Sequence, residues 1–408
     1  MASVRVEEVA DGLLLLRVED RYVRFFEALW EIPEGITYNA YLLRTREGDV
    51  LFDTWKKPFS GLLLDALEEA TGPDRLRYIV VHHMEPDHAG SLPDVARWAP
   101  GARILGHPLA GRMLRDTYPA LAERFRPLRD GEELPLGGGV FVHTPWLHWP
   151  ETSMTWLPGP GVLLSGDAFG GYGIPASVFD DECVEPERML REMRKYVVTV
   201  IGHYLDWVSR ALGKLERLGV EPRVVAPAHG IVWRSNTRRV LEVYRRLAEG
   251  RPVERKVVIL YASMYGTVEV FARAAACRLA REGYRPVVYG YTDTGRPLLS
   301  EVLTDAADAE ALVVATPTYE AEAFPLLRYA LEEICWKARG RGRSAYILAS
   351  QGWGGRAAEE LAEKLRGCGY EPTVVLRYQA VAATAAAAEE AERVAEKLAR
   401  LLGARGEA

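Results

Sequence analysis

The chain has 408 residues, of which 48% are hydrophobic and 26% are charged, and its formal net charge is −6. This length suffices for two or three domains, and the profile is typical of a globular protein. An acidic balance without a basic block argues against nucleic acid as a partner. No apolar stretch reaches the length of a membrane span, and the segment MASVRVEEVADGLLLL lacks a signal-peptide layout, so we expect a cytoplasmic protein.

Cysteine and amide side chains are scarce. Cys183, Cys277, Cys335 and Cys368 are far apart and form no C-x-x-C pair. This spacing argues against a zinc ribbon, a rubredoxin-type iron site and a disulfide framework. Asn and Gln, the thermolabile amides, are nearly absent while Arg and Glu are abundant, which indicates a source that lives at high temperature.

The sequence predicts two domains, 1–250 and 254–408, joined by the short charged linker AEGRPVERK at residues 248–256. The first half mixes short strands with helices such as Gly61–Ala70. Its strands have the sequences TYNAYLLRT, GDVLFDTW, RYIVVHH, GVFVHTP, GVLLSGD and RVVAPAHG, and several of them run into a polar turn.

The second half alternates strictly between strands and helices. A strand at Lys256–Tyr261 precedes a helix near Glu269–Arg281, and the last helix covers roughly Ala385–Leu402. Four more strands read RPVVYGYT, ALVVATP, SAYILAS and EPTVVLRY. This alternation predicts a doubly wound, five-stranded parallel sheet whose ligands lie outside the carboxyl ends of the strands.

The segment HHMEPDH, residues 82–88, concentrates metal-binding side chains at the end of a predicted strand. His83, Glu85, Asp87 and His88 form the pattern H-x-E-x-D-H. Alternate residues of an extended segment share a face, so His83, Glu85 and Asp87 can converge on one place. A single histidine pair of this kind is more often structural, and the interpretation therefore depends on matching residues elsewhere.

Three other strand ends supply such residues. His148 in TPWLHWPETSM, Asp167 in LLSGDAFGG and His229 in VVAPAHGIVWR each follow an apolar strand. With the first segment they make seven candidate ligands, four histidines and three carboxylates. One metal ion normally uses four to six positions, so seven ligands favour two metal ions, and Asp167 could bridge them.

This ligand pattern resembles that of the metallo-β-lactamase fold, an αββα sandwich whose hydrolase members carry H-x-H-x-D-H and mostly bind zinc. Here Glu85 replaces the middle histidine. Carboxylate oxygen shifts the preference from nitrogen-rich zinc sites towards iron or manganese, and in a redox setting we expect a di-iron centre. His82, His107, His143 and His203 are interpreted as surface, core or supporting residues.

A second constellation follows the first strand of the second half. LYASMYGTVEVFA places Ser263, Met264, Tyr265, Gly266, Thr267 and Val268 between a strand and the N-terminus of a helix. Backbone N–H groups and hydroxyls at such a place suit a phosphate monoester. The loop matches neither G-x-x-x-x-G-K-[ST] nor G-x-G-x-x-G, which disfavours nucleoside triphosphates and dinucleotides.

Two further loops at strand ends supply flat aromatic faces and close backbone approach. ATPTYEAEAFP contains Thr316, Pro317, Thr318 and Tyr319, and ASQGWGGRA contains Ser350, Gln351, Gly352, Trp353, Gly354 and Gly355. Together the three loops resemble flavodoxin binding FMN. The phosphate loop of that family usually ends in Asn-Thr, whereas this chain has Thr267-Val268, so Ser263 and Thr267 would have to compensate.

A lactamase-like di-metal domain followed by a flavodoxin-like domain resembles the flavodiiron proteins over essentially the whole chain. GITYNAYLL, the H-x-E-x-D-H motif, LHWP, GDAFG, AHGIVWR, SMYG and GWGG carry the resemblance. It implies one iron on His83, Glu85, His148 and bridging Asp167. It implies the other on Asp87, His229 and Asp167, with His88 as the ligand whose bonding varies among members.

The resemblance also implies an activity and partners. Flavodiiron proteins reduce O2 to water, NO to N2O, or both, with electrons from FMN, and Trp149 and Tyr172 would lie beside the irons. A separate rubredoxin or reduced F420 would donate electrons, and a head-to-tail homodimer would bring the flavin of one subunit to the irons of the other.

Two alternatives remain at this point. One is a zinc-dependent hydrolase with a flavodoxin-like accessory domain, which Glu85 and the FMN loops disfavour. The other is an electron carrier with a vestigial metal site, which the full ligand set disfavours.

Overall fold

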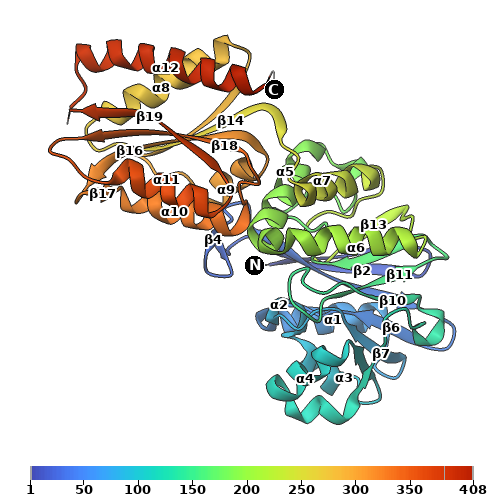
Figure 1. Ribbon diagram of the computed structural model, residues 1–408. Helices are drawn as coiled ribbons and strands as arrows, with labels where there is room; N and C mark the ends of the chain where they lie inside the picture. The colour runs from blue at the N-terminus through green and yellow to red at the C-terminus, as the bar shows by residue number, and fades with distance from the viewer. Residues whose placement is uncertain (1, 381, 407–408) are drawn as a thin grey trace. The chain divides into compact units, whose positions relative to one another are not determined.

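The computed structural model describes residues 2–380 and 382–406, and it divides into two compact units, Met1–Glu249 and Gly250–Ala408. Figure 1 shows both units as layers of helices and sheets. Among the described residues, no helix combines the length and apolar character needed to cross a membrane.

The first unit contains two sheets. The larger sheet has the order β1–β2–β5–β6–β7–β8–β9, with strands Ser3–Ala10, Leu13–Asp20, Ile36–Arg44, Asp49–Phe52, Leu76–Val81, Arg103–Gly106 and Phe125–Pro127. The smaller sheet has the order β10–β11–β12–β13, with strands Val140–His143, Ser153–Leu157, Val162–Gly166 and Val224–Pro227. A two-stranded hairpin, β3 (Phe25–Phe26) and β4 (Trp30–Glu31), completes the strands of this unit.

Apolar side chains from the two sheets interdigitate to form the core of the first unit. Leu15, Phe52 and Val80 of the larger sheet meet Phe141 and Leu164 of the smaller sheet, and all five are buried. Helices lie outside both sheets (Figure 1), at Ser60–Ala70 (α1), Pro86–Ala89 (α2), Leu92–Trp98 (α3), Pro108–Thr117 (α4), Pro186–Tyr196 (α5), Leu205–Arg217 (α6) and Thr237–Glu249 (α7). This arrangement is the expected αββα sandwich.

The second unit is a parallel sheet in the order β15–β14–β16–β18–β19, with strands Arg285–Tyr291, Val253–Ala262, Ala309–Tyr319, Ser344–Gln351 and Glu371–Gln379. In chain order this is 2-1-3-4-5, the flavodoxin-like order predicted for a doubly wound sheet. A two-residue strand, β17 (Glu322–Ala323), pairs antiparallel with the end of β16. The end of β14 and the adjacent ends of β16 and β18 therefore share one edge.

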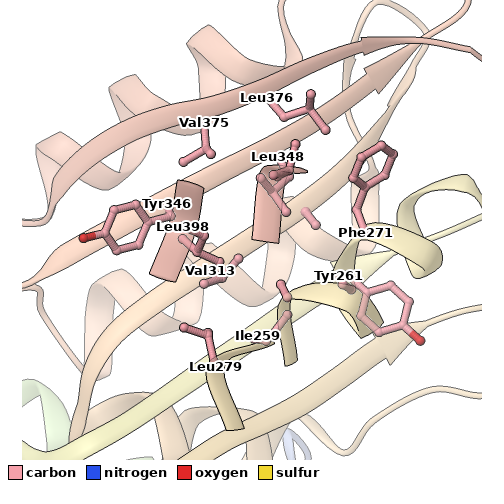
Figure 2. Close-up of a cluster of buried hydrophobic side chains, with 14 of the residues drawn as sticks. Ile259, Tyr261, Phe271, Leu279, Val313, Tyr346, Leu348, Val375, Leu376 and Leu398 are labelled. Atoms are coloured by element: carbon pink, nitrogen blue, oxygen red, sulfur yellow. The ribbon is translucent and has the colours of Figure 1, made fainter. Parts of the chain in front are cut away.

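Helices cover both faces of this sheet. Helices α8 (Thr267–Arg281) and α12 (Ala385–Gly406) pack against each other and close one face, where they bury the apolar cluster of Figure 2. The other face carries α9 (Leu299–Ala307), α10 (Pro325–Lys337) and α11 (Ala357–Gly367). Ile259, Val313 and Leu348 come from three adjacent strands and are 0–2% exposed, so the sheet forms the floor of this cluster.

A disulfide joins Cys335 on α10 to Cys368, which follows α11. The expectation from cysteine spacing, that the chain forms no disulfide framework, is wrong for this pair. The two residues are 33 positions apart in sequence, but α10 and α11 are neighbours in the fold, and their Cα atoms lie 5.2 Å apart. Cys183 and Cys277 are free.

A buried carboxylate ties together two segments of the first unit. Asp180, in a 3-10 turn at Asp180–Glu182, accepts hydrogen bonds from the backbone N–H groups of Arg234, Ser235 and Asn236. The Asn236 side chain donates a further bond of 2.8 Å. Burial would raise the pKa of Asp180, but these hydrogen bonds lower it below its usual value.

Asp180→Ala should lower the free energy of unfolding by about 1–3 kcal/mol at pH 7, because three backbone N–H groups lose their acceptor. A depressed pKa in the folded state gives stability that is present above the unfolded-state value and lost as the pH falls. The difference between variant and parent in urea unfolding should therefore shrink as the pH falls below about 4. A difference that stays constant down to pH 2 would contradict this role of the Asp180 charge.

Candidate metal and flavin sites

The segment after β7 delivers several polar side chains to one place because the chain turns there at once into a short helix. β7 ends at Val81, Glu85 precedes α2 with an extended backbone, and Pro86 starts the helix. Asp87 and His88 lie on this helix and are buried. A strand end followed by an immediate helix thus brings a whole motif into the interior of the unit.

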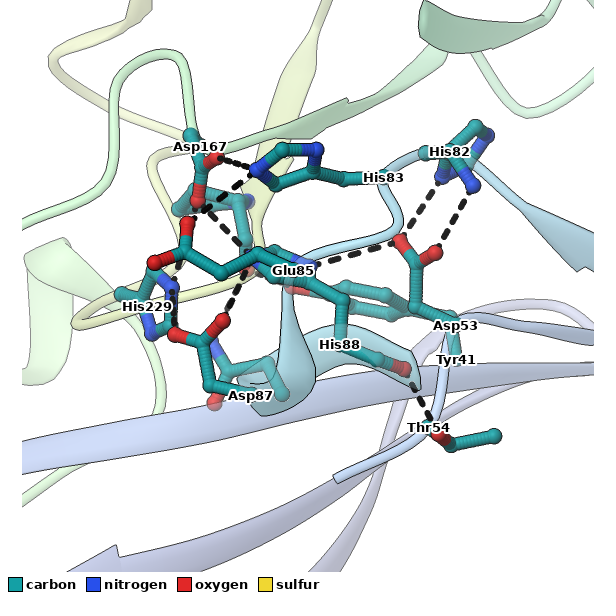
Figure 3. A network of polar contacts seen from close by, with 12 residues as sticks. Tyr41, Asp53, Thr54, His82, His83, Glu85, Asp87, His88, Asp167 and His229 are labelled. Atoms are coloured by element: carbon teal, nitrogen blue, oxygen red, sulfur yellow. Dashed lines mark hydrogen bonds and ion pairs between the residues drawn. The ribbon is translucent and has the colours of Figure 1, made fainter. Parts of the chain in front are cut away.

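Two groups of side chains come together at the ends of β7, β12 and β13 and in the loop between β10 and β11 (Figure 3). Within each group, one ligand atom per residue lies within 4.8 Å of the others. The first group is His83, Glu85, His148 and Asp167, and the second is Asp87, His88 and His229. The structure brings together all seven candidate ligands named from the sequence.

Asp167 lies between the two groups, with one oxygen facing each. Its Oδ1 atom is 3.0 Å from Nε2 of His88 and 3.2 Å from Nε2 of His229. Its Oδ2 atom is 3.6 Å from Nε2 of His83 and 3.5 Å from Nε2 of His148. A carboxylate in this position can bind two cations at once.

Several polar atoms that point into this space are buried without a hydrogen-bond partner. They include both carboxylate oxygens of Asp87 and Oδ2 of Asp167, while Nε2 of His148 and Nε2 of His229 have only carboxylates of the two groups beside them, Glu85 at 2.9 Å and Asp167 at 3.2 Å. Buried polar atoms without partners are rare in folded proteins because each costs free energy. Nitrogen and carboxylate oxygen atoms are the usual ligands of iron and related transition metals, so this donor set fits a pair of metal ions.

The electrostatics of the site favour positive charge. Burial alone would lower the pKa of His83, but hydrogen bonds to Glu151 and Glu85 raise it to about 10. Burial would raise the pKa of Asp167, but the neighbouring histidines hold it well below its usual value. Burial raises the pKa of Asp87, and the charge of Glu85 adds to this effect. The carboxylates thus create a field that a bound cation would satisfy.

Residues behind the seven side chains fix their orientation. Glu151 is fully buried and accepts hydrogen bonds from Nδ1 of His83 at 2.8 Å and from the N–H of Met84 at 3.1 Å. Nδ1 of His229 donates to the backbone carbonyl of Thr37 at 2.8 Å. Each ring thereby directs Nε2 into the site.

Sequence reasoning missed three of these supporting residues, Glu151, Asp53 and Tyr196. Asp53 accepts hydrogen bonds from the backbone and Nδ1 of His82 and lies 3.9 Å from Nδ1 of His88. The Tyr196 hydroxyl donates to Oδ1 of Asp167 at 2.8 Å. Asp53 and Glu151 stand inside quoted strand-end segments, which is the signal that could have pointed to them.

The remaining histidines lie away from the seven ligands or behind them. His82 bonds to Asp53 and, through Nε2, contacts the Thr155 hydroxyl at 2.7 Å. His107 and His143 stack on each other with ring centroids 3.8 Å apart. His203 lies in a 3-10 turn at Gly202–Tyr204 rather than in an α-helix.

Two aromatic residues were expected beside the metal site. The Trp149 ring meets the His83 ring edge-on, with centroids 4.9 Å apart. Tyr172 packs on Tyr196 and contacts the Thr199 hydroxyl at 2.9 Å. Trp149 therefore touches a candidate ligand directly, whereas Tyr172 supports the tyrosine that bonds to Asp167.

The second unit has a cavity of about 340 Å3 at the carboxyl ends of β14, β16 and β18. All three loops predicted from the sequence contribute to its wall. The lining residues are Ser263, Met264, Tyr265, Thr267, Val268, Pro317, Thr318, Tyr319, Glu320, Ser350, Gln351, Gly352, Trp353 and Ala380. Glu320 and Ala380 were not predicted, whereas the predicted residues Gly266, Thr316, Gly354 and Gly355 are not among the lining residues.

The loop at the start of α8 contains Thr267-Val268, the pair that departs from Asn-Thr. Val268 is 3% exposed and belongs to the apolar cluster under the sheet. The hydroxyl of Thr267 is buried and has no hydrogen-bond partner, and Ser263 lines the same cavity. Gly266 adopts a φ of +85°, a left-handed conformation that lets the chain turn into the helix. Thr267 and Ser263 thus leave hydroxyls available to an anion.

Aromatic faces stand open at this cavity. Trp353 is 83% exposed, Tyr265 71% and Tyr319 40%. Gly355 has a φ of +139°, and a side chain there would meet the Ala321 carbonyl, so the backbone of the loop lies close to its neighbour. A phosphate-binding loop beside exposed aromatic rings fits FMN.

Known proteins are similar to this chain in the first unit and over most of its length. Residues 36–230 match the family model described as ODP family beta lactamase. The chain is 29% identical to a nitric oxide reductase of Moorella thermoacetica over 89% of its length and 90% of the relative's. It is 30% identical to a coenzyme F420H(2) oxidase of Methanocaldococcus jannaschii, covering 92% of the chain and 91% of the relative.

Solved structures are similar over nearly the whole chain. A variant of the flavo di-iron protein of Thermotoga maritima has 36% identity and a TM-score of 0.88, covering 98% of this chain and 100% of that one. The rubredoxin oxygen:oxidoreductase of Desulfovibrio gigas has 29% identity and a TM-score of 0.90, covering 99% and 100%. These relatives span both units and are named as redox proteins, so the zinc-hydrolase alternative is not supported. The chain therefore belongs to the flavodiiron protein family of oxidoreductases.

Proposed function

We propose that this chain reduces O2, NO or both at a di-iron centre that receives electrons from FMN. One observation supports the proposal most directly: Asp167 turns one buried oxygen to each of two groups of His and carboxylate ligands. Among the relatives, one is named as a nitric oxide reductase and another as a rubredoxin oxygen:oxidoreductase.

The proposed ligands divide as the two groups do. His83, Glu85, His148 and Asp167 would hold one iron, and Asp87, His88, His229 and Asp167 the other. His88 joins the second set because its Nε2 atom faces Oδ1 of Asp167 at 3.0 Å. When bound, the two ferrous ions would supply two electrons and a place for the diatomic substrate.

The protein residues hold this site in a fixed geometry. Glu151 and the Thr37 carbonyl fix the ring orientations of His83 and His229. The Tyr196 hydroxyl donates a hydrogen bond to Oδ1 of Asp167, with 2.8 Å between the two oxygen atoms. Phe26 and Tyr38 pack edge-on against the His229 ring, and both are buried, which limits the access of water.

The flavin site supports the second half of the proposal. Ser263, Thr267 and the N-terminus of α8 would bind the FMN phosphate, and Tyr319 and Trp353 would flank the flavin ring. FMN carries two electrons at a time, which together with those of the irons makes the four that O2 requires. Two NO molecules require only two.

We further propose a rubredoxin or reduced F420 as electron donor and a head-to-tail homodimer as the active assembly. The names of two similar proteins contain these donors. Each unit has its site at strand ends within its own fold, and a dimer would let the flavin of one subunit serve the irons of another. A cytoplasmic location stays a prediction from the sequence.

Metal and flavin analysis followed by substrate pulses tests the proposed function. The purified protein should contain about two iron ions and one FMN per chain, and after anaerobic reduction its flavin should be reoxidised by O2, by NO or by both. Zinc without flavin, or a reduced protein that reacts with neither gas, would contradict the proposal. Separate pulses of the two gases show which substrate is preferred.

Glu85→His should weaken iron retention and gas reduction while FMN stays bound. The substitution replaces a carboxylate of the first group with a neutral ring and moves the site towards zinc. Iron content, zinc content and the visible flavin spectrum measure the two effects separately. Glu360→Gln serves as a control, because the Glu360 side chain lies in the second unit and accepts a hydrogen bond from the N–H of Ala323. This substitution should leave the iron content unchanged. Loss of iron and FMN together in Glu85→His would contradict this division of labour.

Dilution should separate flavin reduction from gas reduction if the dimer is the active form. As the chain dissociates, the flavin should still accept electrons from a chemical reductant, but turnover per chain with O2 or NO should fall. Sedimentation at each concentration identifies the assembly present. A strictly monomeric preparation that reduces O2 at the full rate would contradict the dimer proposal.

A further inference from the structure

Three buried polar side chains in the larger sheet surround the loop that carries His229. Arg17 lies on β2, and Thr37 and Asn39 lie on β5, where Arg17 and Asn39 are direct partners across the two strands. Arg17 and Thr37 are 0% exposed and Asn39 is 2% exposed. Thr37 and Asn39 belong to the GITYNAYLL segment, and their side chains are neither proposed ligands nor part of the wall of the flavin cavity.

These side chains bond to the loop from Pro227 to Gly230 rather than mainly to one another. Arg17 Nη2 donates to the Gly230 carbonyl at 2.6 Å. Asn39 Nδ2 donates to the carbonyls of Pro227 at 2.9 Å and Gly230 at 3.2 Å. The Thr37 hydroxyl accepts a hydrogen bond of 2.8 Å from the Gly230 N–H. The N–H and the carbonyl of Gly230, the residue after His229, are therefore both hydrogen-bonded to side chains.

The backbone of β5 completes the support. The Asn39 N–H donates to the Ala228 carbonyl at 2.8 Å, and the Thr37 carbonyl accepts the hydrogen bond from Nδ1 of His229. The residues on both sides of His229, and the ring itself, are thus bonded to two alternate positions of one strand. Such a loop has little freedom to rotate the imidazole.

The opposite side of the loop is closed by backbone. Gly230 has a φ of +76°, and a side chain there would lie 2.8 Å from the Gly171 carbonyl. The Gly171 N–H donates to the His229 carbonyl at 3.2 Å, and Gly171 follows Asp167 in the same turn. The His229 loop is therefore hydrogen-bonded to β5 on one side and packed against the loop that follows Asp167 on the other.

The burial of the Arg17 guanidinium costs free energy, because the charged group loses its contacts with water. No carboxylate lies within ion-pair distance of it among residues 2–380 and 382–406, and its Nη1 atom is buried without a hydrogen-bond partner. Its Nε atom donates to Oδ1 of Asn39 at 3.0 Å, which orients the Asn39 amide towards the loop. Burying a guanidinium without a carboxylate partner costs free energy, and the hydrogen bonds that offset part of this cost go to Gly230 and Asn39.

We propose that Arg17, Thr37 and Asn39 are positioning residues that aim Nε2 of His229 at the second metal ion. The proposal rests on the proposed di-metal function. Donation from Nδ1 to the Thr37 carbonyl leaves the Nε2 lone pair for the metal, and the three side chains keep the loop where that lone pair points at the site.

Metal-affinity measurements on two pairs of variants test this role. Thr37→Val removes one hydroxyl at nearly constant volume, and Thr37→Ser keeps it. Asn39→Leu removes the amide, and Asp49→Asn alters a buried carboxylate on β6 that bonds to Thr71 and Arg75, away from the site. Competition between metal-free protein and a chromophoric chelator for Co2+ gives the number and affinity of bound ions without any assay of activity.

Thr37→Val and Asn39→Leu should each lower the affinity for one of the two Co2+ ions by about 10- to 100-fold, the usual effect of substituting a residue that orients a ligand. The other ion should bind as before, and Thr37→Ser and Asp49→Asn should bind both ions like the parent. Urea unfolding of each metal-free variant measures any general loss of stability. If Asn39→Leu fails to fold, the two Thr37 variants decide the question because they differ chiefly in the hydroxyl.

The possible failures are distinguishable. A parent protein that binds no Co2+ pair would overturn the proposed function itself. A parent that binds two ions while Thr37→Val binds both as tightly would overturn only the positioning role. An equal loss of affinity for both ions in Thr37→Val and in Asp49→Asn would also overturn the positioning role. A general loss of rigidity would then explain the result.

Discussion

The structure of the first unit depends on how three carboxylates and four imidazoles can share one buried space. Like charges at this separation repel, and each buried charge loses its hydration. The protein cannot place these groups on one flexible loop, because the loop would open to relieve the repulsion. Four of them come from the segment after β7, and the other three come from the β10–β11 loop and the ends of β12 and β13, whose positions are set by the sandwich core.

The same constraint explains why the surroundings of the site are so heavily hydrogen-bonded. Glu151 and the Thr37 carbonyl each hold the outer nitrogen of one histidine, and Tyr196 holds Asp167. The second unit meets a milder version of the problem, since a phosphate needs only donors. In the proposed site a loop, a helix N-terminus and two buried hydroxyls would meet that need, while aromatic residues of the same cavity, Tyr265 and Trp353, remain exposed.

Much of the fold and the site could be predicted from the sequence because the signals were periodic or local. Apolar strands that end in polar residues marked the strand ends, and strict alternation marked the parallel sheet. Tyr196 was not predicted because its role depends on which side chain lies across from it, and a single Tyr carries no periodic signal. Glu151 lies in a segment that pointed to the site, but its role depends on the His83 ring that faces it. The disulfide between Cys335 and Cys368 was not predicted for the same reason, because it depends on two helices being neighbours in the fold.

The loop after β14 has a consequence for how this chain can be altered. Val268 contributes to the apolar cluster between the sheet and helices α8 and α12, while the adjacent Thr267 presents its hydroxyl to the cavity. A threonine at position 268 would replace an apolar side chain that contributes to both this cluster and the cavity wall. Consecutive residues of this loop thus serve the cavity wall and the core of the unit, so a substitution at position 268 alters both at once.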